Sequence, residues 1–123
     1  MAGVHIRHKN EVQPIVSDHG ETVFEILGKA AGGSAAYSVA HIELAPGKAS
    51  LKHYHPVAEE SYYILSGEAR LVIDGEADTL TPGQCVAIAP EMVHQIFNDG
   101  PDLLQFLAIC VPAWTPDNSI YLE

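Results

Sequence analysis

The sequence predicts an all-β protein, either a sandwich or a barrel, and three observations support this. Short apolar or alternating segments recur about every ten residues and are separated by Gly, Pro, Asn and Asp, which is typical of strands joined by turns. No segment shows the 3.6-residue period of a helix. The 123 residues are enough to bury a core and few enough to form one domain.

The first half of the expected strands is delimited by glycine and by two turns. A strand at 22–27 ends at a Gly-rich loop, 28–34, and the next strand ends at Pro46-Gly47. The aromatic and β-branched strand that follows closes at Ser66-Gly67. The expected strands in this half are 22–27, 37–44, 50–55 and 61–65.

The second half begins with a hairpin. Asp74-Gly75, between the segments 69–73 and 77–80, is a strong signal for a hairpin. Pro82-Gly83 and Pro90 separate the next strands, and 98–101 turns the chain into its longest apolar segment. The expected strands in this half are 69–73, 77–80, 85–89, 94–97 and 103–111.

We expect residues 1–123 to form a single domain with its barrel core at about 22–111, flanked by N- and C-terminal extensions. The tail that begins at Pro112 is too rich in proline to continue a strand, although Trp114 is expected to pack on the body.

Composition excludes several partners. The net charge of −10, without a cluster of Lys or Arg, argues against nucleic acid and against anionic membrane surfaces. No apolar segment approaches the roughly 20 residues of a membrane-spanning helix, and the N-terminus lacks the apolar part of a signal peptide. Cys85 and Cys110 each lie in an apolar segment, so we interpret them as buried, reduced thiols of a cytoplasmic protein.

Three histidines and a carboxylate suggest a metal site. His53 and His55 are two residues apart, so on a strand both imidazoles point to the same face. Glu59 or Glu60 supplies an acidic side chain, and periodicity alone does not choose between them. His94 supplies a third imidazole. Three nitrogens and one oxygen suit Fe, Mn, Ni, Co, Cu or Zn better than Ca or Mg, and leave coordination positions open on an octahedral ion.

The other histidines are interpreted differently. His5, His8 and His19 lie in polar N-terminal sequence and are expected at the surface. His41 lies in the middle of a strand, where a surface position is favoured over one that lines a cavity.

Two motifs resemble those of the cupin family. The first joins a glycine, the His-x-His pair, a glutamate and a second glycine at the family spacing, and it matches at every fixed position: Gly47, His53, His55, Glu60 and Gly67. The second motif matches at Gly83, His94 and Asn98. It departs from the family at Ala89, where Pro is usual, and at Glu91, where Gly is usual, so the departures concern the turn before His94.

The resemblance implies a double-stranded β-helix, a jelly-roll barrel. It also implies one divalent transition metal held by His53, His55, Glu60 and His94, with Glu59 facing outward or acting behind the ligands. Small single-domain members of this kind often resemble mannose-6-phosphate isomerase, and they commonly form homodimers. The family includes enzymes, regulators and storage proteins, so the fold alone does not define the reaction.

We therefore expect a metal-dependent enzyme acting on a small organic substrate. Dioxygenase-type chemistry is favoured slightly over isomerisation, because three histidines and a glutamate with open positions suit iron or manganese. The small number of Lys and Arg residues near the motifs also disfavours phosphorylated substrates. Tyr62 is a weak catalytic candidate, since it shares a strand face with Glu60. Gln105, alone in an apolar strand, either supports the ligands or faces outward. The alternative is a non-catalytic small-molecule-binding or sensing protein with a structural metal.

Overall fold

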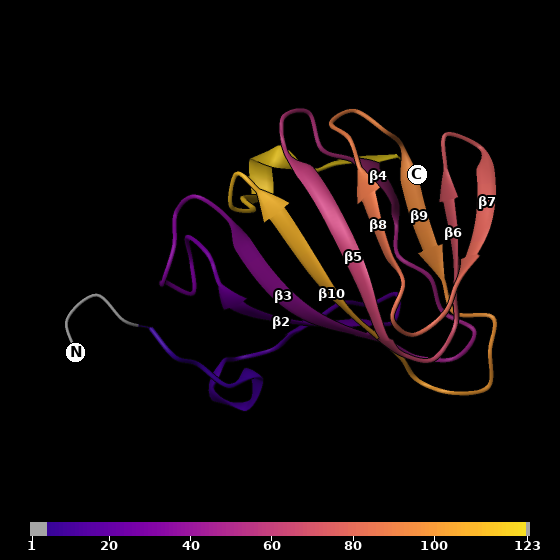
Figure 1. Cartoon of the computed structure of the whole chain (residues 1–123), viewed down its shortest axis with the longest axis horizontal. Coiled ribbons are helices and arrows are strands. Elements are labelled where there is room, and N and C mark those ends of the chain that lie inside the picture. The colour runs from indigo at the N-terminus through magenta and orange to yellow at the C-terminus, as the bar shows by residue number, and fades with distance from the viewer. Residues whose placement is uncertain (1–4, 123) are drawn as a thin grey trace.

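In a computed structural model, which describes residues 5–122, the chain folds into two antiparallel β-sheets that face each other (Figure 1). The six-stranded sheet has the order β1-β2-β3-β10-β5-β8, and the five-stranded sheet has the order β11-β4-β9-β6-β7. Neighbours distant in sequence, such as β3 and β10, pair within one sheet, so the predicted all-β jelly-roll architecture is confirmed.

The six-stranded sheet contains β1 (Ile15–Val16), β2 (Glu21–Leu27), β3 (Ser38–Leu44), β5 (Glu59–Ser66), β8 (Cys85–Ile88) and β10 (Leu104–Val111). The five-stranded sheet contains β4 (Lys52–Tyr54), β6 (Ala69–Ile73), β7 (Glu76–Leu80), β9 (His94–Phe97) and β11 (Ile120–Leu122). Two 3-10 helices, η1 (Lys9–Glu11) and η2 (Pro116–Asn118), lie outside the sheets. Among residues 5–122, no helix is both long and apolar enough to cross a bilayer.

Local chemistry explains the main turns. Asp74 and Gly75 both have positive φ, 48° and 86°, as the hairpin between β6 and β7 requires. Gly67, at φ 85°, ends β5 where a Cβ would lie 2.7 Å from the Leu103 carbonyl oxygen, so only glycine fits there.

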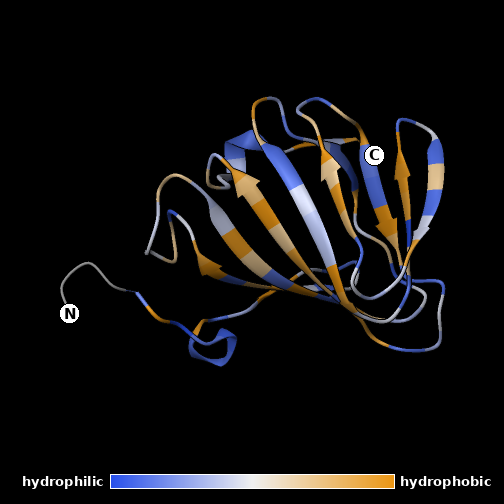
Figure 2. Ribbon diagram, in the orientation of Figure 1, coloured by the Kyte–Doolittle hydropathy of each residue, from blue (hydrophilic) through white to orange (hydrophobic). Residues whose placement is uncertain are grey.

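The core lies between the sheets and follows from strict alternation. Along β10, every second residue is buried: Leu104, Phe106, Ala108 and Cys110. Figure 2 shows β10 as a mostly apolar strand, since its outward-facing residues are largely apolar as well. The apolar core is completed by residues such as Leu44, Ile64, Leu71, Ile88 and Ile96.

The structure adds two short strands to those expected. β1 pairs with β2 at one edge of the six-stranded sheet. β11 pairs with β4, with Tyr121 opposite His53. The Pro-rich tail is thus followed by a strand that returns to the barrel, and Trp114 packs with its indole nitrogen bonded to Ser119.

One cysteine prediction is wrong. Both thiols are unpaired, and Cys110 is buried, but Cys85 is exposed. Cys85 lies opposite Tyr63 in the register of β8 with β5, and Tyr63 also faces outward. An apolar segment is not necessarily buried on both faces, because one side of an outer strand remains in contact with solvent.

Candidate metal centre and its cavity

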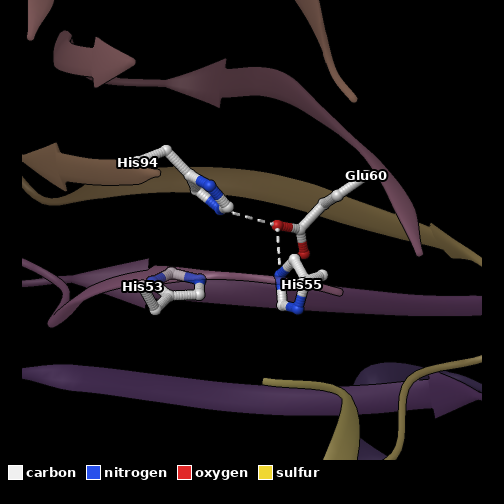
Figure 3. A group of neighbouring side chains, drawn as sticks. All are labelled: His53, His55, Glu60 and His94. Carbon is white, nitrogen blue, oxygen red and sulfur yellow. Dashed lines mark hydrogen bonds and ion pairs between the residues drawn. The ribbon is translucent and has the colours of Figure 1, made fainter. Parts of the chain in front are cut away.

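The four predicted ligands meet between the two sheets. His53 lies on β4, His55 directly after it, and His94 begins β9 opposite His53. Glu60 comes from β5 in the other sheet. The ligand atoms of these four side chains all lie within 4.8 Å of one another, and three of the residues are buried (Figure 3).

Backbone carbonyls set the orientation of each ring. Nδ1 lies 2.7 Å from the Leu51 oxygen in His53, and 2.9 Å from the Met92 oxygen in His94. In His55, Nδ1 lies 2.7 Å from the Asn118 oxygen. Because a carbonyl only accepts hydrogen bonds, each Nδ1 carries its proton, and Nε2 is the nitrogen available to a metal.

Glu60 connects the two sheets through one oxygen. Its Oε1 accepts hydrogen bonds from Nε2 of His55 at 3.0 Å and of His94 at 3.1 Å (Figure 3). Its Oε2 accepts from the Cys110 thiol at 3.2 Å. Burial alone would raise the pKa of Glu60, but the two histidines outweigh it and hold the pKa well below its usual range. The carboxylate is therefore ionised and directed at the imidazoles.

The histidines differ in their protonation. Burial, together with the nearby His94, lowers the pKa of His53 to about 4, so its ring is neutral at pH 7. Burial also opposes protonation of His55, but the hydrogen bond and charge of Glu60 outweigh it and raise the pKa of His55. A metal at this position would replace the protons that Glu60 now shares with its two partners.

The C-terminal segment supports the cluster from behind. Besides the Asn118 carbonyl, the Ser119 hydroxyl lies 3.1 Å from Nδ1 of His55 and accepts a hydrogen bond of 3.0 Å from the Trp114 indole. The Tyr121 ring lies over His53, with centroids 5.6 Å apart. Residues 114–121, which we call the C-terminal strap, therefore hold two of the four candidate ligands.

The cluster forms one wall of a cavity of about 260 Å³. Strands β2, β3, β5 and β10 contribute the rest of the barrel wall, and the strap closes one side. Residues from β2 that line the cavity alternate along the strand: Glu21, Val23 and Glu25. A space of this size accommodates a small organic molecule beside the imidazoles.

The structure also places the remaining candidates. Glu60 is buried and Glu59 exposed, as expected from the family spacing. Tyr62 lines the cavity with its ring 6.0 Å from that of His94, and it also packs on Phe106 in the core. Burial, followed by the charge of Glu60, raises the pKa of Tyr62, so its hydroxyl stays protonated.

His41 and Gln105 do not take part in the site. His41 Nε2 lies 3.1 Å from the Gln105 amide oxygen. The cavity is lined instead by Ala40 and Ile42, the neighbours of His41, and by neither partner of this pair. Gln105 therefore faces outward rather than supporting the ligands.

Several residues that line the cavity were not predicted from the sequence. The predicted surface position of His19 is corrected. His19, expected at the surface, lines the cavity and pairs with Glu21, with His19 Nε2 2.8 Å from Glu21 Oε1. The strand alternation of 21–27 placed Glu21 and Glu25 on one face and was the available signal. The position of His19 depends on the turn before β2, which carries no comparable periodicity.

The turn before His94 accommodates the departure from the family pattern at Glu91. Glu91, where the family usually has glycine, adopts φ 71°, a conformation that favours glycine. Its backbone N–H donates to the His55 carbonyl at 2.8 Å. The turn thus keeps the shape that a glycine would give, with an unfavourable conformation at one exposed residue.

The donor set fits a transition metal. Three imidazoles with their second nitrogens already bonded, and one ionised carboxylate, are the ligands and supporting contacts that such ions require. The sheet strands hold all four within one small volume.

The comparisons with known proteins agree with this fold. A family model described as "Cupin domain" matches residues 40–110, more than half of the chain. The chain therefore belongs to the cupin family, and its architecture is that of a small single-domain member. A search of curated proteins found no match.

Solved structures resemble nearly the whole chain. Streptomyces PAC13, solved with uridine, is 12% identical with a TM-score of 0.82, and the match covers 98% of this chain and 92% of that one. A predicted oxalate decarboxylase from Thermotoga maritima is 25% identical with a TM-score of 0.78, covering 88% and 99%. A sugar phosphate isomerase of the cupin superfamily from Silicibacter pomeroyi is 24% identical with a TM-score of 0.78, covering 97% and 82%. The reactions named in these descriptions differ, so the likeness extends to the fold and not to one activity.

Proposed function

We propose that this cupin is a metal-dependent enzyme that acts on a small organic substrate, with His53, His55, Glu60 and His94 holding one divalent transition metal. The convergence of three imidazole Nε2 atoms and a carboxylate at the wall of a cavity carries the proposal. When bound, the metal supplies a Lewis-acid or redox centre, with positions not taken by protein ligands.

The chain's own residues define how a substrate is received. Glu60 is held at both oxygens, so its orientation toward the imidazoles is defined before a metal arrives. Tyr62 offers a protonated hydroxyl at the cavity wall and would donate a hydrogen bond to a substrate oxygen. Apolar residues such as Ile42 and Ala108 line the space and limit water.

Within enzymes, we favour dioxygenase-type oxidation slightly over isomerisation. A phosphosugar isomerase needs cations to bind phosphate. Arg70 lies within the motif region, but it does not line the cavity. Its guanidinium forms an ion pair with Asp99 at 2.6 Å and lies over the Phe97 ring. Assembly as a homodimer and a cytoplasmic location, which suits two unpaired thiols, complete the proposal.

A second candidate is a small-molecule-binding or sensing protein whose metal is structural. It is favoured by the position of the cluster, because the histidines come from one sheet and Glu60 from the other. A metal there would link the sheets and stabilise the folded state, with or without turnover.

The variant His94→Ala distinguishes the enzyme from the protein with a structural metal. Elemental analysis of the natively expressed protein should find about one transition-metal ion per chain. Oxygen-uptake screening against small acids, thiols, diketones and phenols would then identify turnover. In the enzyme, His94→Ala abolishes turnover. In the structural-metal protein, it mainly lowers the melting temperature.

Two results would contradict the proposal. Metal at trace levels in the wild-type protein would remove its basis. Unchanged metal content in His94→Ala would exclude His94 as a ligand in either function. His41→Ala, on the outer face of β3, is the matched control and should retain both metal and activity.

A further inference from the structure

The wall of the cavity opposite the imidazoles is acidic. Glu21 and Glu25 of β2 both line the cavity, in addition to Glu60. They lie four residues apart on one strand face, with Val23 between them. The organic ligand therefore meets carboxylates on two sides.

The two β2 carboxylates are not equally compensated. Glu21 Oε1 has a side-chain partner, since it lies 2.8 Å from His19 Nε2. Glu25 Oε2 accepts one hydrogen bond, from the Ala31 N–H at 3.2 Å. Its Oε1 has no donor within residues 5–122, and burial raises the pKa of Glu25. A cationic group beside Glu25 would offset this unfavourable burial.

No protein cation serves that purpose. All six lysines and arginines lie among the described residues, and none of them lines the cavity. Lys9 pairs with Glu43 and lies over the Phe24 ring, and Arg7 donates to the carbonyls of Ile26 and Ala31. An anionic ligand would therefore find no lysine or arginine in the cavity as a counter-charge.

Polar side chains connect the two ends of the site. Glu60, Cys110 and Ser38 are register partners across β5, β10 and β3. Glu25 lies on the neighbouring strand β2. A Cβ placed on Gly28 would lie 3.2 Å from Glu25 Cδ and 3.0 Å from Ser38 Cβ, so the side chains of Glu25 and Ser38 are close together. The backbones of β5 and β2 are three strand spacings apart, about 14 Å, and the inward side chains shorten the distance that a ligand must span.

We propose that the cavity takes a small organic molecule with a protonated amine at one end, bound by Glu25, and an oxygen or nitrogen ligand for the metal at the other. This inference rests on the proposed function for its metal-binding end. Its amine-binding end depends only on the charges of the cavity. Glu25 would then determine specificity rather than take part in the reaction.

The test uses matched probes that differ only in charge. The metal-loaded protein is titrated with 3,4-dihydroxybenzylamine, 3,4-dihydroxybenzyl alcohol and 3,4-dihydroxybenzoate, whose catechol oxygens bind metals. The amine should bind about tenfold more tightly than the alcohol, and the benzoate more weakly than either, because a partly buried ion pair forms only with the amine. Equal binding, or tighter binding of the benzoate, would overturn the inference.

Variants test whether Glu25 is the residue that binds the amine. Glu25→Gln should remove the preference for the amine while leaving the affinity for the alcohol unchanged. Glu43→Gln, on the outer face of the neighbouring strand, should keep the preference. A Glu25→Gln protein that still prefers the amine would show that Glu25 is not the determinant. Glu25→Ala, which also removes the charge, gives the same comparison if the glutamine variant unfolds.

A metal-free arm separates this inference from the proposed function. Benzylamine, benzyl alcohol and benzoate are titrated into protein in a strong chelator. A preference for benzylamine that depends on Glu25 supports the amine site even if no metal is found in native protein. A metal-containing protein without that preference supports the proposed function and contradicts the amine site.

Discussion

At the scale of single residues, each candidate ligand is oriented by a contact on its far side. Nδ1 of His53 is bonded to Leu51, and that of His94 to Met92, in both cases a carbonyl two residues earlier in the chain. These contacts are local, so strand geometry alone places two of the three imidazoles correctly. His55 differs, because its partner Asn118 is 63 residues away.

The lowered pKa of His53 predicts a pH dependence of stability in metal-free protein. The unfolded ring takes up a proton near pH 6.5, whereas the folded ring does so only near pH 4. Stability is therefore lost as pH falls from 6.5 to 4, by about 3 kcal/mol at most. Urea unfolding in a chelator across this range measures the loss.

His53→Gln is the control for this effect. Glutamine is neutral throughout, so the variant should lose about 3 kcal/mol less than the wild-type protein over the same pH range. Contributions from other groups, including the raised pKa of His55, occur in both proteins and cancel in the comparison. Equal losses in both proteins would show that His53 is not the group responsible.

At the scale of elements, the C-terminal strap connects a segment remote in sequence to the candidate metal centre. β11 adds an edge strand to β4, and η2 presents the Asn118 carbonyl to His55. Asn118 Oδ1 also accepts from the Val57 N–H at 3.1 Å, which fixes the loop between β4 and β5. The strap therefore supports the part of the chain that runs from His55 to Glu60.

Removing one contact of the strap should weaken metal binding. Ser119→Ala deletes the hydroxyl that lies 3.1 Å from Nδ1 of His55. Loss of such a supporting contact reduces metal affinity by about tenfold or more. Competition with a chelating dye measures the change.

Thr115→Ala provides the matched control. It removes a hydroxyl from the same segment, but that hydroxyl bonds to exposed Asp117 rather than to a candidate ligand. Its metal affinity should equal that of the wild-type protein. If the two variants lose affinity equally, the strap stabilises the fold in general and does not position His55.

At the scale of the whole molecule, the outer face of the six-stranded sheet is unusually apolar. Tyr63 and Leu65 of β5 are 39% and 40% exposed, and Val111 of β10 is 54% exposed. Exposed apolar side chains on an outer sheet face are often covered at subunit interfaces. It supports the proposed homodimer, in which two such faces would cover each other.

The dimer is tested by sedimentation. The wild-type protein should sediment at about twice the chain mass of 13.2 kDa at micromolar concentrations. Tyr63→Lys, which places a charge on the apolar face, should shift the protein toward monomer. Val57→Lys, at an exposed loop position outside that face, should not. A wild-type protein that sediments as a monomer would contradict the proposal.

The sequence predicted the barrel strands well because alternation and turn residues are local signals. Asp74-Gly75 specifies a hairpin, and Gly and Pro at positions such as Pro46-Gly47 and Pro82-Gly83 mark the ends of other strands. β1 and β11 were not predicted, since they have two and three residues and form only because a neighbouring strand is already in place. Short edge strands depend on tertiary contacts that no local window contains.

The candidate site was also predicted in part from the sequence. The four proposed ligands came from motif spacing, and the structure brings them together. The exposure of Cys85 and the place of His19 in the cavity were missed, because both depend on which neighbour covers a given face. The strap was missed for the same reason, because His55 and Asn118 are far apart in sequence.

The strap also has a consequence for the order in which the site forms during synthesis. The four candidate ligands have all been translated once His94 is added, but the carbonyl that orients His55 belongs to Asn118. A nascent chain that has grown only as far as β10 thus carries every donor atom and lacks the contact that presents one of them. The set of candidate ligands is therefore fully supported only after η2 and β11 have joined the barrel.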